Sequence, residues 1–525
     1  MRSPLIELDG KSYDVVIVGA GANGASAAQH LAAAGYSLLV LDKGDFASGS
    51  SSRSSRLLHC GLRYLAPGES MWEFLRSPDK LRIALRMAKQ AMAARAQLVE
   101  TAPERVQKLT FCFPIYAGGP YRRWQASLAL RLLRSLGPTS VPLDDRMIEG
   151  AEIADTPLAR WLRDRDKLRG LAAFTEYRFE WPERIILDEI LDAERLGADA
   201  RNYTAVTGMQ RGGDGGWTLT LADALRSSES ATVSAKIVLN MAGIWIDKVN
   251  ALAVPRARRR ITGTKGTHIM MRLPLDCANH GLVAINRLNE PFYCVPWRGL
   301  HFFGPTETLY EGDPDQIRPL EEEIEWLIEE SNHMLPALGL KREHVLFSWA
   351  GVRPLGAHPD FPKGKRSREV HDLAEDGMPG VYAMTAGPIM THRSAGPELT
   401  ALVRSKLPPS RPAQAPSYAA RLYPDNQNSP PLFDDDTSIK LSDLRAAARQ
   451  EHAVSLIDLM FRRVGAGWTA TMGHDAAERA AQAVAVEMGW DAAHQAGEVR
   501  AYRAYLEEHF RVQPGHSAPM VEPRA

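Results

Sequence analysis

The stretch YDVVIVGAGANGASAAQHLAAAGYSLLVLDKGD, residues 13–45, decides the fold of this chain. A short β-branched run leads into a glycine turn, and an alanine-rich segment with helical character follows it. Gly35 is placed to end that helix, and a second apolar strand comes next. This order of strand, helix and strand predicts a βαβ unit that opens an α/β fold.

The glycine turn has the spacing of a dinucleotide-binding loop. Gly19, Gly21 and Gly24 form G-x-G-x-x-G directly after the strand, with Asn23 inside the motif and Asp42 at the end of the next strand. In such a loop the first glycine permits the turn, the second lets the backbone approach a pyrophosphate, and the third lets helix and strand meet. The helix N-terminus offers N–H groups to the phosphates, and the acid accepts hydrogen bonds from a ribose diol. We therefore expect a dinucleotide whose adenosine ribose lacks a 2'-phosphate.

Composition limits the classes of protein to consider. With 525 residues the chain is expected to form two or three folded units. Lys plus Arg and Asp plus Glu both total 63, so there is no overall positive charge to hold nucleic acid, and any recognition by charge must be local. The four cysteines include no C-x-x-C pair, which predicts neither a metal site nor a disulfide framework and favours a cytoplasmic setting.

A segment rich in hydroxyl groups follows the ribose-binding acid. Residues 48–65 read SGSSSRSSRLLHCGLRYL. Here the chain resembles the FAD-dependent glycerol-3-phosphate dehydrogenase family of the aerobic, quinone-linked type, whose members read close to TSS-x-SSKLIHGGLRYL. The resemblance implies FAD as the cofactor and Arg63 with Tyr64 on the substrate side of the flavin. It implies cofactor contacts by Ser50, Ser51, Ser52, Ser54, Ser55, Gly61 and Leu62.

The resemblance continues along most of the chain. Residues 237–246, IVLNMAGIWI, look like the family's second dinucleotide-contact strand, where Gly243 lets the backbone approach the cofactor. Residues 265–268, KGTH, match its K-G-x-H, and residues 351–355, GVRPL, match its G-x-R-P-L. Residues 451–463, EHAVSLIDLMFRR, resemble the signature of its C-terminal helical domain. The shared order of these motifs indicates a diverged member of the family.

The resemblance also implies where the chemistry takes place. Oxidation of a secondary hydroxyl removes its proton while a hydride leaves the same carbon for flavin N5. His268 is the candidate base. Arg353 and Arg63 are the candidate cations at the substrate, because the planar fork of arginine suits phosphate oxygens. Arg368, in the basic run KGKRSREV, is a further candidate, although this run could equally be a solvated hairpin tip.

One departure from the family bears on the substrate. Where the family has G-G-K-L-T-T-Y-R, residues 386–393 read AGPIMTHR, so a lysine is replaced by Pro388, which carries no charge. Gly387 and Thr391 of this segment remain candidates for cofactor contacts. The family's T-T-D is likewise changed to residues 305–307, PTE.

The sequence and the resemblance together predict a three-part architecture, α+β overall. A discontinuous Rossmann-like FAD-binding domain interleaves with a substrate or cap domain built on a mixed antiparallel sheet, and an all-helical C-terminal domain follows a proline-rich linker. The predicted ranges are 1–75, 185–260 and 345–405 for the FAD-binding domain, 76–184 and 261–344 for the cap, 406–435 for the linker and 436–525 for the helices.

The leading hypothesis is FAD-dependent oxidation of sn-glycerol 3-phosphate or a similar polyol phosphate, with electrons passed to quinone or another acceptor. Two alternatives stay open. One is an oxidoreductase of the same fold acting on an unphosphorylated hydroxy or amino substrate, and the other is a non-catalytic interaction protein that retains FAD. Residues 121–137 combine apolar side chains with arginines, so peripheral contact with the inner face of the cytoplasmic membrane and packing against the cap are both open, as is a homodimer.

Overall fold

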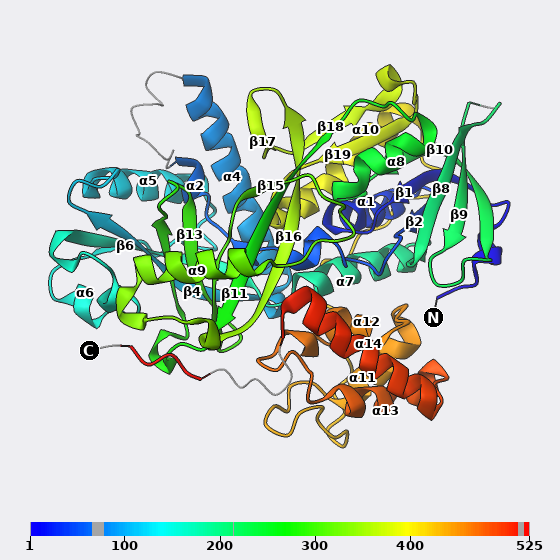
Figure 1. Cartoon of the computed structure of the whole chain (residues 1–525). Coiled ribbons are helices and arrows are strands. Elements are labelled where there is room, and N and C mark those ends of the chain that lie inside the picture. Colours follow the sequence, from blue (N-terminus) through cyan, green and yellow to red (C-terminus); the bar gives the residue numbers. More distant parts are fainter. Residues whose placement is uncertain (1, 66–77, 214, 513–518, 524–525) are drawn as a thin grey trace.

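The predicted βαβ unit lies at the centre of the first of two large sheets (Figure 1). The computed structural model describes residues 2–65, 78–213, 215–512 and 519–523. The first sheet has the strand order β18-β19-β10-β1-β2-β7, and β1 pairs in parallel with both β2 and β10. Its strands, with β8 and β9 extending β10 in antiparallel fashion, are β1 (Ser12–Val18), β2 (Leu38–Leu41), β7 (Asp199–Arg201), β8 (Thr204–Arg211), β9 (Trp217–Asp223), β10 (Ser230–Asn240), β18 (Glu369–Asp372) and β19 (Val381–Thr385).

Three helices cover one face of this sheet. They are α1 (Ala22–Ala33), α7 (Pro182–Arg195) and α10 (Ala395–Lys406), and their apolar side chains form one buried cluster with β1, β2, β10 and β19. The alanines of α1 are almost all buried, because small side chains let α1 lie close to both neighbouring helices. Helix α8 (Ile246–Ala253) contributes to the apolar cluster that also contains the β8–β9 hairpin.

The second sheet is mainly antiparallel and has the order β17-β16-β11-β14-β13-β12-β4-β6-β3, with β15 on β11 and β5 on β6. Its strands are β3 (Leu57–Leu58), β4 (Val106–Tyr116), β5 (Arg146–Ile148), β6 (Leu168–Phe179), β11 (Ile261–Met271), β12 (His280–Ile285), β13 (Pro291–Trp297), β14 (Leu300–Gly304), β15 (Thr308–Tyr310), β16 (Val345–His358) and β17 (Phe361–Lys365). Helices α4 (Pro78–Thr101), α5 (Arg123–Leu136) and α9 (Glu321–Met334) pack around it.

The segment 345–405, assigned from the sequence to the FAD-binding domain, is shared between the two sheets. Strand β16 pairs with β11 along nearly its whole length, because the ladder from Ile261 opposite Gly356 to Met271 opposite Val345 is almost continuous. Only β18 and β19 join the first sheet. The boundary expected at residue 75 lies outside the described residues.

The proline-rich segment lies against the first sheet's helices. The amide of Arg411 donates to the carbonyl of Gly35 at 2.9 Å, and the amide of Gln414 donates to Ala33 at 2.7 Å. Ser417 N donates to Asp192 of α7 at 2.8 Å. The segment therefore follows the surface of α1 and α7.

The C-terminal helices pack directly on the second sheet, at the bottom of Figure 1. They are α11 (Leu441–Gln450), α12 (Leu456–Asp458) with a π-helical turn over 459–463, α13 (Ala477–Met488) and α14 (Ala492–Phe510). The ring of Trp468 lies 5.4 Å from that of Trp297 on β13 and 6.2 Å from that of Trp349 on β16. This buried aromatic cluster joins the helices to the second sheet.

Candidate functional site

The glycine turn after β1 has two glycines that the protein itself requires, whereas Gly21 and, after β10, Gly243 meet no backbone atom closely. A Cβ on Gly19, whose φ is +106°, would lie 2.5 Å from the carbonyl oxygen of Met241. A Cβ on Gly24 would lie 1.9 Å from the oxygen of Gly19, so helix and strand meet there. In contrast, a Cβ on Gly21 would meet only Ser51 Oγ, at 3.2 Å, and one on Gly243 would meet nothing within 4 Å among the described residues. The backbone is thus open at Gly21 and Gly243, as close approach of a dinucleotide requires.

The start of α1 and the end of β2 supply the polar groups of this cradle. Asn23 lies in the first turn of α1, and Ala22 N at its start donates to Ser51 Oγ at 3.0 Å. Asp42 accepts hydrogen bonds from Ala20 N at 2.8 Å and from Gly44 N at 2.9 Å. Burial raises the pKa of Asp42 to about 6 in spite of these two bonds. Lone pairs that remain on this carboxylate can accept bonds from a ribose diol.

The serine segment uses part of its hydroxyl groups to fix its own conformation. Ser52 Oγ donates to the carbonyls of Ser48 and Gly49, inside the turn Ser50–Arg53. Ser54 Oγ accepts from Arg56 N at 3.2 Å. The other two bonds reach the second sheet: Ser50 Oγ donates to Val352 O at 2.6 Å, and Ser55 Oγ is hydrogen-bonded to His268 Nε2 at 2.9 Å.

Three arginines and one carboxylate meet where the two sheets adjoin. Arg63 comes from α2 (Leu62–Leu65), Arg353 from β16, and Arg366 from the turn between β17 and β18. Glu307 lies between β14 and β15, and Arg366 Nη2 donates to its carboxylate. All these side chains are half-buried. We call this set the arginine pocket: Arg63, Tyr64, Tyr293, Glu307, Arg353 and Arg366.

The charged residues of the arginine pocket shift one another's pKa values. Burial alone would raise the pKa of Glu307, but the charges of Arg366, Arg353 and Arg63 and the bond from Arg366 lower it. Burial, together with the charges of Arg366 and Arg63, lowers the pKa of Arg353 to about 10 despite the opposing effect of Glu307. Arg353 Nη1 is buried and has no hydrogen-bond partner among the described residues. A buried guanidinium without a full set of acceptors indicates a place for an anion.

Comparisons with known proteins show the family of the chain. Residues 14–393 match the family described as FAD dependent oxidoreductase. A glycerol-3-phosphate dehydrogenase of Synechocystis sp. is 31% identical over 435 residues, which cover 80% of this chain and 75% of the relative. The chain belongs to this FAD-dependent oxidoreductase family. The predicted resemblance to its glycerol-3-phosphate dehydrogenases, the α/β class and the FAD cofactor are therefore confirmed.

Solved structures show the same fold. The glycerol-3-phosphate dehydrogenase from Bacillus halodurans, complexed with FAD, aligns with a TM-score of 0.72 at 20% sequence identity and covers 98% of both chains. The L-alpha-glycerophosphate oxidase from Mycoplasma pneumoniae, with FAD bound, aligns at 0.56 and 17% identity and covers 79% of this chain and 99% of its own. The first of these alignments includes the C-terminal helices, since it spans nearly the whole chain.

The residues of the cradle fit the FAD of this family. The open backbone at Gly21 and Gly243 leaves room for the pyrophosphate, next to the N-terminus of α1, where helix N–H groups favour an anion. Asp42 supplies the carboxylate for the ribose. Gly61 has a different role, because a Cβ there would lie 2.9 Å from the Cα of Ala88 in α4. Leu62 follows it as the first residue of α2.

His268 lies behind the arginine pocket. Its side chain is only 1% exposed, stacks on the ring of Trp349 at 4.7 Å and contacts Ser55 through Nε2. Burial, with the nearby charges of Arg353 and Arg56, lowers the pKa of His268 well below its usual value, so the ring is neutral. Its role as base remains a prediction, and its Nε2 is hydrogen-bonded to the Ser55 hydroxyl.

Arg368 is not placed like Arg366. Its guanidinium forms an ion pair with Glu398 of α10 at 2.8 Å and donates to the carbonyl of Thr391 at 3.0 Å. Its stem runs past Gly387, whose Cβ would lie 3.2 Å from the Cβ of Arg368. The structure therefore groups Arg368, Gly387 and Thr391 around the start of α10.

Sequence reasoning missed three residues that the structure places at the site. Arg366 belongs to the basic run that drew attention to Arg368, but only the turn between β17 and β18 decides which side chain faces the pocket. Tyr293 gave no signal beyond a strand pattern. His59 stands against the ring of Tyr64, 5.4 Å between centroids, with Nδ1 buried and unpaired among the described residues.

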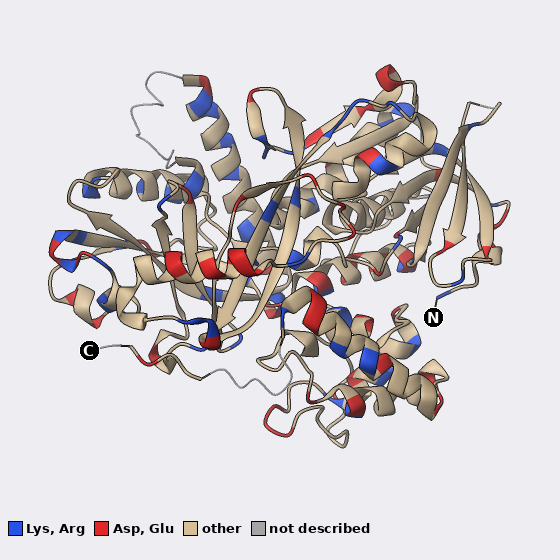
Figure 2. Ribbon diagram, viewed as in Figure 1, with Lys and Arg blue, Asp and Glu red and all other residues tan. Residues whose placement is uncertain are grey.

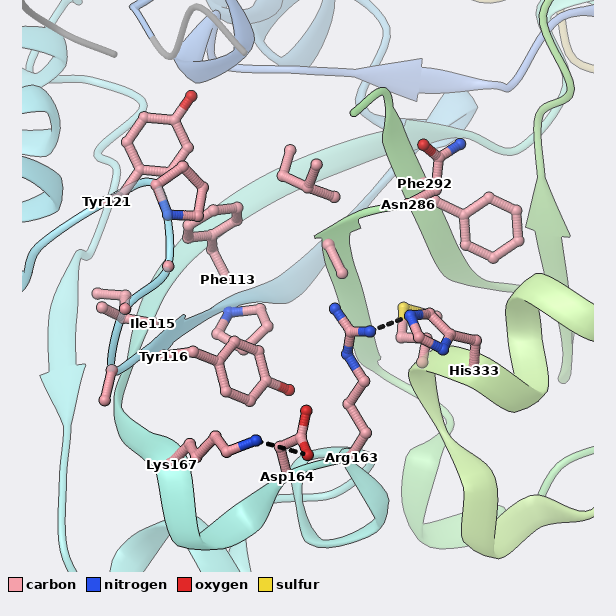
Figure 3. Close-up of a pocket in the computed structure, with 18 of the residues that line it drawn as sticks. Phe113, Ile115, Tyr116, Tyr121, Arg163, Asp164, Lys167, Asn286, Phe292 and His333 are labelled. Carbon is pink, nitrogen blue, oxygen red and sulfur yellow. Dashed lines mark hydrogen bonds and ion pairs between the residues drawn. The ribbon is translucent and has the colours of Figure 1, made fainter. Parts of the chain in front are cut away.

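A separate cavity of about 250 Å³ opens between the end of β4, β12 and the end of α9 (Figure 3). Aromatic rings of Phe113, Tyr116 and Phe292 line it. Arg163 donates a hydrogen bond to His333 Nε2, Lys167 forms an ion pair with Asp164 at 3.5 Å, and Glu330 pairs with Arg287 outside the cavity. The cavity shares no lining residue with the arginine pocket.

The remaining surface carries charge of both signs. Figure 2 shows Lys and Arg interspersed with Asp and Glu over most elements, and acidic residues along α9. Helix α5 packs on the cap through Leu130 and Leu133, while Trp124 and Leu128 are 59% and 50% exposed. Among the described residues, no helix is both long enough and apolar enough to cross a membrane.

Proposed function

We propose that this protein oxidises the secondary hydroxyl of sn-glycerol 3-phosphate or of a similar polyol phosphate. The observation that carries the proposal is the arginine pocket, in which Arg353 Nη1 is buried without a partner among the described residues. Arg63, Arg353 and Arg366 carry three positive charges and Glu307 carries one negative charge, so the pocket has a surplus of about two, the charge of a phosphate dianion. The names of the relatives point to the same substrate class.

The residues at the site have separate roles in substrate binding and proton transfer. Arg353 and Arg63 hold the phosphate by charge-assisted hydrogen bonds, which fixes the carbon chain relative to the flavin. Bound FAD supplies a hydride acceptor at N5. His268, neutral and hydrogen-bonded to Ser55, takes the hydroxyl proton through that serine.

A second candidate is an oxidoreductase acting on an amino or unphosphorylated hydroxy substrate. Glu307 favours an amino substrate, because its carboxylate could pair with an ammonium group while Arg353 and Arg63 hold a carboxylate. The remaining alternative is a non-catalytic protein that retains FAD. It is suggested by Pro388, which carries no charge where the family has a lysine.

Anaerobic mixing of the FAD-loaded protein with a substrate panel separates these readings. Under the proposal, sn-glycerol 3-phosphate bleaches the flavin absorbance rapidly, whereas glycerol and glycine leave it unchanged. Bleaching by an amino acid alone would establish the second candidate. A flavin that no member of a broad panel reduces would support the non-catalytic reading and overturn the proposal.

The proton path needs its own pair of variants. We expect His268→Ala to retain FAD and to slow flavin reduction by sn-glycerol 3-phosphate about 100-fold, since general bases contribute roughly 10²–10⁴-fold. Ser55→Ala should give a similar loss, because it breaks the connection to Nε2. Reduction at the wild-type rate in both variants would remove His268 from the reaction.

We further propose that electrons pass to quinone and that the protein contacts the inner face of the cytoplasmic membrane through α5. The exposed Trp124 and Leu128, next to arginines of the same helix, support this. Co-sedimentation with anionic vesicles should fall in a Trp124→Ala/Leu128→Ala variant, and equal sedimentation of the two proteins would contradict it. Light scattering of the purified protein tests the proposed homodimer.

A further inference from the structure

The loop that contains Pro388 is hydrogen-bonded to the two segments that carry Arg353 and Arg366. Ala386 N donates to the carbonyl of Pro354, the residue after Arg353, at 2.8 Å. Gly387 N donates to the carbonyl of Arg366 at 3.3 Å. Pro388 has no charge and no N–H group. The backbone of Arg366 therefore lies next to Pro388, the position in this loop that carries no charge.

The side chain of Arg366 contacts the arginine pocket. It is bonded to Glu307, and its charge acts on Arg353, Tyr64 and Tyr293 as well. The side chain is 34% exposed and that of Glu307 is 16% exposed, so the pair is accessible to a ligand from solvent.

Neighbouring cations have partners elsewhere. The ion pairs that hold them are Lys363 with Glu290, Lys365 with Glu369, Arg368 with Glu398 and Arg393 with Glu189. His392 and Arg393, which follow Pro388 in the sequence, are buried against α7. Of the cations from 363 to 393, Arg366 is the one that these contacts place at the pocket.

We propose that Arg366 is the third cationic ligand for the anionic group of the substrate, and that Glu307 is its counterion until the substrate binds. This inference rests on the proposed function. It adds that Arg366 supplies the positive charge that is missing at Pro388. Arg353, Arg63 and Arg366 would then surround a phosphate from three sides. Glu307 reduces the charge of the pocket so that a dianion, and not a monoanion or a neutral polyol, balances it.

Direct binding to the oxidised, FAD-loaded protein tests the role of Arg366. The probes are inorganic phosphate and dihydroxyacetone phosphate, the ketone that the proposed oxidation produces, and the signal is the change in flavin absorbance. Loss of one charge-assisted contact predicts roughly 10- to 100-fold weaker binding in Arg366→Ala and a smaller loss in Arg366→Lys. Lys363→Ala, at the exposed end of the same hairpin, is the matched control and should bind as the wild type does.

A second variant tests the counterion. Glu307→Gln removes the competing carboxylate, so phosphate should bind several-fold more tightly, and the preference for dihydroxyacetone phosphate over neutral dihydroxyacetone should rise. Weaker binding in Glu307→Gln would overturn the counterion role. Unchanged binding in Arg366→Ala, with FAD content and thermal stability preserved, would overturn the ligand role.

Failure of the proposed function would look different. In that case the wild-type protein itself would bind neither phosphate probe and would not be reduced by sn-glycerol 3-phosphate. Failure of the present inference alone leaves wild-type binding intact and shows only as insensitivity to Arg366→Ala.

Discussion

Arg463 and Asp45 form an ion pair whose two side chains are completely buried, and this pair ties the C-terminal helices to the loop after β2. Arg463 Nη2 donates to Asp45 Oδ1 at 2.8 Å, and Arg462 bonds to the same carboxylate. Asn202 Nδ2 donates to it at 2.8 Å. Because Asp45 closely follows Asp42, the helical region supports the loop that is expected to hold the ribose of FAD.

Removing this carboxylate should destabilise the protein strongly. Asp45→Ala leaves the buried Arg463 without its counterion and leaves Arg462 with Asp458 alone, and breaking a buried pair in this way costs about 3–5 kcal/mol. Urea unfolding followed by tryptophan fluorescence measures the loss, and FAD should dissociate at a lower urea concentration. Asp434→Ala is the control, since Asp434 is 96% exposed in its pair with Arg479 and should contribute about 0–1 kcal/mol. Equal unfolding midpoints for the two variants would refute the supporting role.

The glycine turn allows binding and folding to be separated. Gly21→Ala adds a methyl group where only Ser51 Oγ is near, at 3.2 Å, so the FAD-free protein should keep its stability. The same methyl group occupies the space over the N-terminus of α1, and we expect FAD to bind at least about tenfold more weakly, a loss of about 1.4 kcal/mol. Fluorescence titration of FAD-free protein measures this affinity.

Two other glycine variants serve as comparisons for Gly21→Ala. Gly497→Ala, in α14 where a Cβ would meet only Arg500 Nη2 at 3.9 Å, should leave FAD affinity unchanged. Gly24→Ala should prevent folding, because its Cβ would lie 1.9 Å from the oxygen of Gly19. A Gly21→Ala protein that binds FAD as tightly as the wild type would show that the pyrophosphate lies elsewhere.

The geometry of the glycine turn could be predicted from the sequence. The glycines, Asp42 and the serines lie within one short stretch around a single βαβ unit, where local spacing determines the geometry. The substrate half could not be predicted in the same way. Arg63, Glu307, Arg353 and Arg366 come from four separate segments, and their meeting depends on the register between β11 and β16 and on the turn after β17.

The choice between Arg366 and Arg368 shows this limit. Two arginines separated by one residue in a turn have no fixed periodicity, so no pattern assigns a direction to either. Arg368 pairs with Glu398 of α10, and Arg366 pairs with Glu307 after β14. These two ion pairs fix the directions of the two side chains. Both carboxylates are distant in sequence from the turn.

The pKa of Asp42 predicts how FAD affinity depends on pH. Burial raises this pKa to about 6 in the FAD-free structure, and ribose hydroxyl groups would donate to the ionised form and lower it again. FAD affinity should therefore fall as the pH drops below about 6 and level off above it. Titrations from pH 5 to 8 test this, with Asp42→Asn expected to bind weakly without this dependence. An exposed control, Asp79→Asn, should keep the wild-type profile, and a flat wild-type profile would argue against the ribose contact.

Glu176 gives a pH dependence of stability with a defined sign. Burial raises its pKa to about 7 although Arg95 and the amide of Cys60 favour the ionised form. The neutral carboxyl therefore contributes stability that is present below the unfolded pKa of about 4.3 and is lost as the pH rises to about 7, by up to roughly 3 kcal/mol. The glutamine in Glu176→Gln stays neutral at every pH. The free energy of unfolding of the variant minus that of the wild type should therefore rise by about this amount between pH 5 and pH 8. Urea denaturation at each pH measures this difference. The exposed Glu322→Gln should show no such trend, and a constant difference for Glu176→Gln would mean that the buried carboxyl does not titrate in this range.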